Sequence, residues 1–185
     1  KVEIKQLVQN ASQMDITVHL PDIRVLNEFF VLHEKKIYFG LTDVKGFGSS
    51  MYKKLIKLIN DKNIVLEELS WYQMVTKVLT NITSTAVKAL IQCGALDFYG
   101  ISRTKMLFEY EIVSDLTAKE LEYAVENCLE NGSLIDIINC VIGKPRMSSR
   151  RKDKLEAFIH SINNPPYALI DSPEWIADKE EECLG

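Results

Sequence analysis

Residues 40–50 of the chain read Gly-Leu-Thr-Asp-Val-Lys-Gly-Phe-Gly-Ser-Ser, and this stretch is the most informative part of the sequence about the fold. Gly46 and Gly48 flank one apolar residue, Phe47, and both glycines are expected at positive φ. Such a turn points consecutive backbone N–H groups outward, next to the positive end of the following basic helix. We expect Phe47 to anchor the turn and Lys45 to supply a positive charge. The pattern predicts a helix-hairpin-helix motif, which holds nucleic-acid phosphates without reading bases.

A plain helical hairpin with a glycine turn would use the same residues, so this alternative stays open at this point. A nucleotide cofactor is not supported. The stretch lacks a Gly-Lys-Ser/Thr at the distance of a Walker loop, and Met51 stands where a dinucleotide fingerprint has its third glycine.

A second candidate phosphate site lies at residues 94–105. Ser102 is expected to start a helix, with Arg103 and Lys105 in its first turn, where the helix dipole favours acids. An external phosphate would compensate these two cations. The predicted DNA-backbone-binding residues are Val44, Lys45, Gly46, Phe47, Gly48, Ser49, Ser50, Lys53, Lys54, Ser102, Arg103 and Lys105.

Helical periodicity continues on both sides of these sites. The 185 residues include eight glycines and five prolines, which favours helices over a turn-rich sheet protein. We expect an extended segment at 15–23 and a hairpin at 29–39 with its tip at 33–36. The predicted fold is mostly α, with a small N-terminal β element and helix-hairpin-helix motifs. Helices are expected at about residues 2–12, 49–59, 66–75, 84–93, 102–110, 118–130, 133–142, 155–162 and 173–185.

Several motifs follow one another in an order that is more specific than any one of them. They are Pro21-Asp22-Ile23, Ile37-Tyr38-Phe39-Gly40-Leu41, the turn at 44–48, Ala89-Leu90-Ile91-Gln92-Cys93-Gly94-Ala95-Leu96-Asp97, and Gly100-Ile101-Ser102-Arg103. This order resembles the fingers-to-helix-hairpin-helix region of bacterial DNA polymerase III alpha subunits, the C-family replicative polymerases. The resemblance covers about residues 1–110 and 171–185. Arg24 replaces the family's usual asparagine, and 111–170 is helical where the family has a short linker, which favours a divergent phage or prophage relative.

The resemblance implies four segments. Residues 1–40 would be the end of a fingers-like region with short strands, and 41–110 a tandem helix-hairpin-helix DNA-binding module. Residues 111–170 would be a divergent helical segment, and 171–185 the beginning of a helix that continues further. The partners implied are DNA, as duplex or primer-template, and the remainder of a polymerase chain, without a membrane.

The chemistry of such a polymerase is expected to lie elsewhere. Two-metal nucleotidyl transfer needs clustered carboxylates, for which Mg²⁺ would be the cofactor of the parent polymerase. The close acids here, at 67–68, 120–122 and 180–182, fall on helical surface patterns. We therefore predict no catalytic, cofactor-binding or metal-binding residue in this chain.

The net charge is −4, so a surface that binds nucleic acid all over is not expected. Two basic blocks stand out, at 45–62 and 144–154, and the second is a candidate for phosphate contacts only if local structure supports it. Acidic blocks lie at 109–130 and 171–182. Residues 143–152 are expected to form an exposed connection, because Gly143 and Pro145 break the preceding helix. No internal repeat of fixed period is apparent.

Four cysteines, Cys93, Cys128, Cys140 and Cys183, lie far apart without a Cys-X-X-Cys pair. They predict four reduced thiols in a cytoplasmic protein. Two other functions remain open: a stand-alone helical module that binds a basic partner through the acidic face at 109–130, and a DNA-repair accessory protein with the same hairpin.

Overall fold

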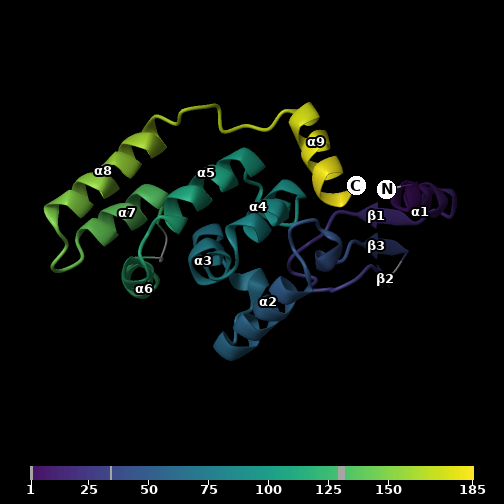
Figure 1. Cartoon of the computed structure of the whole chain (residues 1–185), viewed down its shortest axis with the longest axis horizontal. Helices are drawn as coiled ribbons and strands as arrows, with labels where there is room; N and C mark the ends of the chain where they lie inside the picture. Colours follow the sequence, from purple (N-terminus) through teal and green to yellow (C-terminus); the bar gives the residue numbers. More distant parts are fainter. Residues whose placement is uncertain (1, 34, 129–131) are drawn as a thin grey trace.

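The computed structural model describes residues 2–33, 35–128 and 132–185, and within them the chain is mostly helical with one small sheet, as predicted (Figure 1). The α-helices of these ranges are α1 (Val2–Gln13), α2 (Ser49–Lys62), α3 (Trp71–Lys77), α4 (Ser84–Gln92), α5 (Arg103–Ser114), α6 (Ala118–Asn127), α7 (Leu134–Ile142), α8 (Ser149–Asn163) and α9 (Pro173–Leu184). The short 3-10 helices are η1 (Leu41–Asp43), η2 (Leu66–Glu68), η3 (Leu79–Asn81) and η4 (Asp97–Tyr99).

Side-chain caps explain where several helices begin. The predicted capping box of α6 is confirmed: the Thr117 hydroxyl accepts from the N–H of Glu120, and the Glu120 carboxylate accepts from the N–H of Thr117. The helix expected over 66–75 is instead split into η2 and α3, because Ser70 forms a capping box with Gln73 and starts a new helix. Helix α6 ends at Asn127, before the predicted end near residue 130; residues 129–131 lie outside the described residues.

The small sheet contains β1 (Thr17–His19), β2 (Val31–His33) and β3 (Lys36–Tyr38) in the order β1-β3-β2. The predicted hairpin is confirmed, since β2 and β3 pair antiparallel with Leu32 opposite Ile37. The predicted extended segment becomes β1, which pairs parallel to β3 and places Val18 opposite Ile37. Part of the predicted hairpin tip, residue 34, lies outside the described residues.

A continuous hydrophobic core links the helices. It includes the fully buried side chains of Phe47, Leu90, Met106, Ile138 and Leu155, which come from both 41–110 and 111–170. Figure 1 shows α1 and the sheet at one end of the molecule and α7 with α8 at the other, with α3, α4 and α5 between them. The four-segment division stays a prediction.

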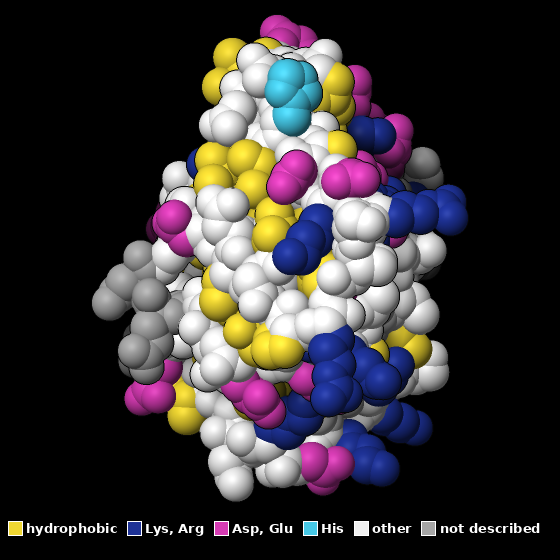
Figure 2. Space-filling model, turned by 90° about the vertical axis from the view of Figure 1, so that its left-hand side faces the viewer, with side chains coloured by type: hydrophobic (Ala, Val, Ile, Leu, Met, Phe, Trp, Pro, Cys, Tyr) yellow, Lys and Arg dark blue, Asp and Glu magenta, His cyan; other side chains and the backbone are white. Residues whose placement is uncertain are grey.

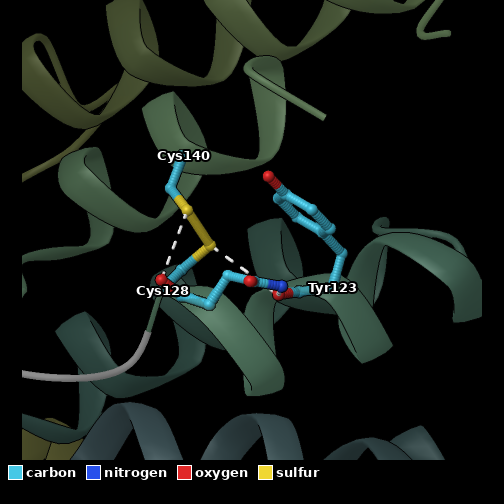
Figure 3. The surroundings of a disulfide bond; sticks show 4 residues. Tyr123, Cys128 and Cys140 are labelled. Atoms are coloured by element: carbon cyan, nitrogen blue, oxygen red, sulfur yellow. Dashed lines mark hydrogen bonds between the residues drawn. A yellow bond between two sulfur atoms is a disulfide. The ribbon is translucent and has the colours of Figure 1, made fainter. Parts of the chain in front are cut away.

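The prediction of four reduced cysteines is wrong for two of them. Cys128, at the end of α6, and Cys140, in α7, form a disulfide with their Cα atoms 5.9 Å apart (Figure 3). The packing of α6 against α7 brings together two residues that are 12 positions apart. Cys93 and Cys183 are free and buried, and burial raises the pKa of the Cys93 thiol to about 12.

Helix α8 begins earlier than expected and is fixed to α6. Because Ser148 caps the helix, residues 149–152 are helical, and the connection is only 143–148. Arg151 donates to both Glu120 carboxylate oxygens, at 2.8 and 2.7 Å, and also to the carbonyl of Asp115. Burial alone would raise the pKa of Glu120, but the hydrogen bonds from Arg151 and Thr117 outweigh it and lower this pKa to about 2.

Because of this ion pair, we expect the free energy of unfolding to fall when Glu120 is protonated in acid. The Glu120 pKa is below its ordinary value of 4.5, so the contribution is complete above pH 4.5 and is lost as the pH falls toward 2. We expect the stability advantage of the parent over Glu120→Gln to shrink by about 1–2 kcal/mol between pH 5.5 and 2.5. Urea unfolding of both proteins at these pH values measures the difference. A constant difference would show that Glu120 titrates normally in the fold.

Candidate nucleic-acid interface

The turn between η1 and α2 has the geometry of a tight hairpin, but only one of its glycines has a positive φ. Gly46 has φ +95°, and a Cβ there would lie 3.2 Å from the Cβ of Ala89 in α4. Gly48 has φ −86°, so the expectation of a positive φ at this position is wrong. It serves instead as the N-cap of α2, in extended backbone with open space around it. Phe47 is fully buried and anchors the turn, as expected.

The start of α2 leaves a group of backbone donors without acceptors. Gly48 has no side chain to cap the helix, and the first turn of α2 contains no acid. Among the described residues, no acceptor is bonded to the N–H groups of Gly46, Gly48, Ser49 or Ser50. All four residues are exposed. Together with the positive end of the helix dipole, these N–H groups form a site that favours an anion.

Four lysines lie close to this site along the chain, one before it and three after it, and the one before it has an internal partner. Lys53, Lys54 and Lys57 are exposed on α2, and none of them forms an ion pair with a described residue. Lys45 is also exposed, but its N–H donates to the carbonyl of Cys183 and its ammonium to the carbonyl of Glu182, at 2.9 and 3.0 Å. The end of α9 therefore lies against the hairpin.

The second candidate site, at the start of α5, is already occupied by the chain's own carboxylate. Asp171 accepts from the N–H of Arg103 at 2.7 Å, and from the N–H and hydroxyl of Thr104 at 2.9 and 2.6 Å. These hydrogen bonds outweigh the effect of burial and lower the pKa of Asp171. The Ser102 hydroxyl accepts from the N–H of Lys105 and donates to the carbonyl of Leu169. An internal acid thus takes the place that the sequence assigns to an external phosphate.

The side chain of Arg103 is buried, with 4% of its surface exposed, and does not face solvent. It donates to both Asp97 oxygens, at 3.0 and 2.7 Å, to Glu180 at 2.8 Å, and to the carbonyl of Gln92. Burial lowers the Arg103 pKa, but the hydrogen bonds to Asp97 and Glu180 outweigh it, so this pKa lies above its ordinary value. Gly94, at φ +87°, admits this packing, since a Cβ there would lie 2.5 Å from the guanidinium. The expectation of a phosphate contact by Arg103 is corrected: this arginine joins α4, α5 and α9.

Lys105 is exposed but lies near a buried acid of its own helix. Its ammonium is 3.9 Å from the carboxylate of Glu109, which also accepts from the indole N–H of Trp71 at 2.7 Å and from the hydroxyl of Tyr72 at 3.2 Å. Burial raises the pKa of Glu109, and burial together with Glu109 raises that of Tyr72 to about 12. Lys105 therefore partly neutralises a structural carboxylate.

The structure brings one of the two predicted groups together at a surface. Seven predicted residues are exposed on one hairpin and its helix: Lys45, Gly46, Gly48, Ser49, Ser50, Lys53 and Lys54. Val44 and Phe47 belong to the same hairpin but are buried. Ser102, Arg103 and Lys105 belong to a helix start that Asp171 occupies. The capping of α5 by Asp171 was not predicted from the sequence. Its only local signal is its place before Ser172-Pro173, far from α5 in the sequence.

Within ranges 2–33, 35–128 and 132–185, no group of three or more histidine, cysteine or acidic side chains is placed to hold a metal ion. In the same ranges, no helix combines the length and the apolar character needed to cross a membrane.

Comparison with known proteins agrees with this geometry. Residues 15–106 match a family model described as helix-hairpin-helix motif. Relatives named DNA polymerase III subunit alpha occur in Ureaplasma parvum serovar 3 (29% identical over 109 residues, 58% of this chain and 11% of the relative) and Buchnera aphidicola subsp. Schizaphis graminum (32% over 106 residues, 57% and 9%). A third, in Thermotoga maritima, is 29% identical over 90 residues, 49% of this chain and 10% of the relative.

These matches confirm the resemblance to DNA polymerase III alpha subunits and the presence of a helix-hairpin-helix region. The chain spans about a tenth of the length of these relatives.

Proposed function

We propose that residues 41–110 hold DNA by its sugar-phosphate backbone, without reading its sequence, as part of a replicative DNA polymerase alpha subunit. The observation that carries this proposal is the set of four unbonded N–H groups at Gly46, Gly48, Ser49 and Ser50. A backbone N–H that is exposed at a helix start binds an anion when no side chain of the chain competes for it.

The contrast between the two helix starts supports this assignment. At α5, Asp171 satisfies the N–H groups of Arg103 and Thr104, so a phosphate would have to displace an internal carboxylate. At α2, the N-cap is Gly48, which brings no side chain. The same chain thus closes one helix start and leaves the other open, and we assign DNA contact to the open one.

The hydrogen-bond donors at the start of α2 are suited to bind phosphates and not base edges. They are backbone N–H groups and the flexible ammonium groups of Lys53, Lys54 and Lys57, none of which has the planar paired donors that read a base edge. Phosphate contacts fix position on a duplex but carry no sequence information. The interaction is therefore expected to tolerate any DNA sequence.

We also propose that the whole protein is a DNA-directed DNA polymerase, since its relatives are named DNA polymerase III subunit alpha, and that this chain contributes DNA holding only. The carboxylates for Mg²⁺ and nucleotidyl transfer are assigned to other parts of that protein. A phage or prophage origin and a cytoplasmic location stay predictions.

The alternative of a protein-binding acidic face at 109–130 has less support. Glu109 is buried against Trp71 and Tyr72, and Glu120 is paired with Arg151. Two of the acids of this block thus act inside the fold.

Salt-dependent DNA binding tests the proposal. In fluorescence anisotropy with two 20-base-pair duplexes of unrelated sequence, we expect equal dissociation constants of about 10⁻⁶ to 10⁻⁴ M at physiological salt. Lys53→Gln/Lys54→Gln should reduce the slope of log K against log salt by about two units, since each phosphate contact contributes about one. Lys35→Gln/Lys36→Gln, at two exposed positions, in the turn before β3 and at the first residue of β3, is the charge-matched control and should keep the parent slope. Affinities that differ more than about tenfold between the two duplexes would contradict backbone holding.

A further inference from the structure

The connection between α7 and α8 repeats the backbone of the first hairpin one hundred positions later. Gly46 has φ +95°, and Arg146 has φ +64° although it carries a side chain. Two residues further on, Gly48 and Ser148 are the N-caps, in extended backbone at φ −86°, ψ 175° and φ −71°, ψ 151°. Helices α2 and α8 begin at the next residue in each case.

Several hydrogen bonds of the two turns also correspond, although the bond from the N–H of Phe47 to the carbonyl of Val44 has no counterpart at Met147 among the described residues. The carbonyl of Gly48 accepts from the N–H groups of Met51 and Tyr52, at 2.9 and 3.1 Å. The carbonyl of Ser148 accepts from those of Arg151 and Lys152, at 3.1 and 3.0 Å. Before the turns, the N–H of residue 44 donates to the carbonyl of residue 41, and that of residue 144 to the carbonyl of residue 141.

Buried side chains of the two hairpins also lie one hundred positions apart. Leu55 and Leu155 are both fully buried at the same distance along their helices. Phe47 is buried under the first turn, and Met147 is half-buried in the equivalent place and packs against the core. Residues 141–155 therefore form a hairpin unit of the same kind as residues 41–55.

The charges of this unit divide into an inner set, whose members form ion pairs, and an outer set, whose members form none with the described residues; Lys154 of the inner set is exposed and Lys144 of the outer set is half-buried. Arg151 pairs with Glu120, and Lys154 pairs with Asp115 at 2.6 Å, which fixes α8 to the rest of the fold. The outer set forms no ion pair with a described residue and consists of Lys144, Arg146, Arg150 and Lys152. We call these four residues the outer cations. The sequence from 144 to 154 contains one acid, Asp153.

Figure 2 shows the end of the molecule at which α7 joins α8, and Lys and Arg side chains lie along its right-hand side, most of them in its lower part, with Asp and Glu side chains among them. The outer cations lie within nine positions of the sequence, and like charges close together repel one another, which an anionic partner would relieve. A phosphate backbone provides regularly spaced negative charges and gains affinity from each cation that it meets.

We propose that the outer cations and the hairpin at 143–150 form a second contact to the phosphate backbone of double-stranded DNA. The inference deepens the proposed function, because it rests on the first hairpin holding DNA in the same manner. The second hairpin depends more on side chains than the first, since Ser148 already accepts from the N–H of Arg151. Its arginines provide paired N–H donors that match phosphate oxygens.

Neutralising two outer cations tests this contact. Arg150→Gln/Lys152→Gln leaves the pairs of Arg151 and Lys154 intact, and thermal unfolding followed by circular dichroism should match the parent. In anisotropy with a fluorescein-labelled random 20-base-pair duplex, we expect about three- to tenfold weaker binding and a salt slope reduced by about two units. Lys35→Gln/Lys36→Gln, at the start of β3 and at the opposite end of the molecule from α8, should bind as the parent does.

The pair Lys53→Gln/Lys54→Gln separates the two proposals. Parent affinity and slope in Arg150→Gln/Lys152→Gln, with a reduced slope in the α2 variant, would overturn the second contact and leave the proposed function standing. A reduced slope only in the α8 variant would support the second contact and contradict the role of α2. Equal loss in the sheet control would overturn both, because total charge alone would then explain binding, and so would an absence of binding by the parent.

Discussion

Replacing Arg103 with methionine is expected to lower the free energy of unfolding by about 2–4 kcal/mol. The side chain is 4% exposed and binds two carboxylates and one carbonyl, so its removal leaves Asp97, Glu180 and the carbonyl of Gln92 without their shared donor. Removing one partner of a fully buried ion pair costs about 3–5 kcal/mol, and the partial exposure of Asp97 and Glu180 reduces this.

Urea unfolding at neutral pH measures this loss. Lys105→Met, two residues further along α5, is the matched control, because its ammonium is exposed and only 3.9 Å from one carboxylate oxygen. It should change stability by less than about 1 kcal/mol. If Arg103→Met unfolded like the parent and instead lost DNA affinity, the guanidinium would belong to the DNA interface after all.

The elements that were predicted correctly are those whose sequence patterns, such as helix caps and apolar periodicity, involve residues close together in the chain. The capping box of Thr117 and Glu120, the cap at Ser172 before Pro173 and the period of apolar residues in α2 all depend on neighbours in the sequence. The buried Phe47 and the positive φ of Gly46 were predicted on the same basis.

The features that sequence reasoning missed depend on distant residues. Asp171 caps a helix 68 positions earlier, and Glu180 reaches Arg103 across 77 positions. We predicted an external phosphate at the start of α5, but the carboxylates that bind there, Asp171, Asp97 and Glu180, belong to the chain itself. The disulfide of Cys128 and Cys140 likewise depends on how α6 packs against α7.

The second hairpin could not be predicted from the sequence, because it lacks the two glycines that identify the first hairpin. Arg146 adopts the positive φ that Gly46 has, and Ser148 replaces the glycine N-cap. Without those glycines the second turn has no glycine signature, although the buried leucine of each helix lies at the same position.

Replacing Gly48 with aspartate should move stability and DNA affinity in opposite directions. The backbone at φ −86°, ψ 175° suits any residue, and no atom lies within 4 Å of a Cβ built there. An N-cap aspartate bonds to the first-turn N–H groups and complements the helix dipole, so α2 should gain a few tenths of a kcal/mol. The same carboxylate occupies and repels the proposed phosphate position, so DNA binding should weaken at least tenfold, about 1.4 kcal/mol.

Gly48→Asn is the control, because asparagine caps a helix about as well as aspartate but brings no charge. It should gain similar stability and lose much less affinity.

The most direct measurement is the dissociation constant of one random duplex for the parent, Gly48→Asp and Gly48→Asn at low salt, with unfolding curves of all three proteins. A phosphate site at the start of α2 predicts that the aspartate variant is at least as stable as the parent and binds at least tenfold more weakly, with the asparagine variant between them. Equal affinity of all three proteins would contradict it, because the start of α2 would then not be where DNA is held.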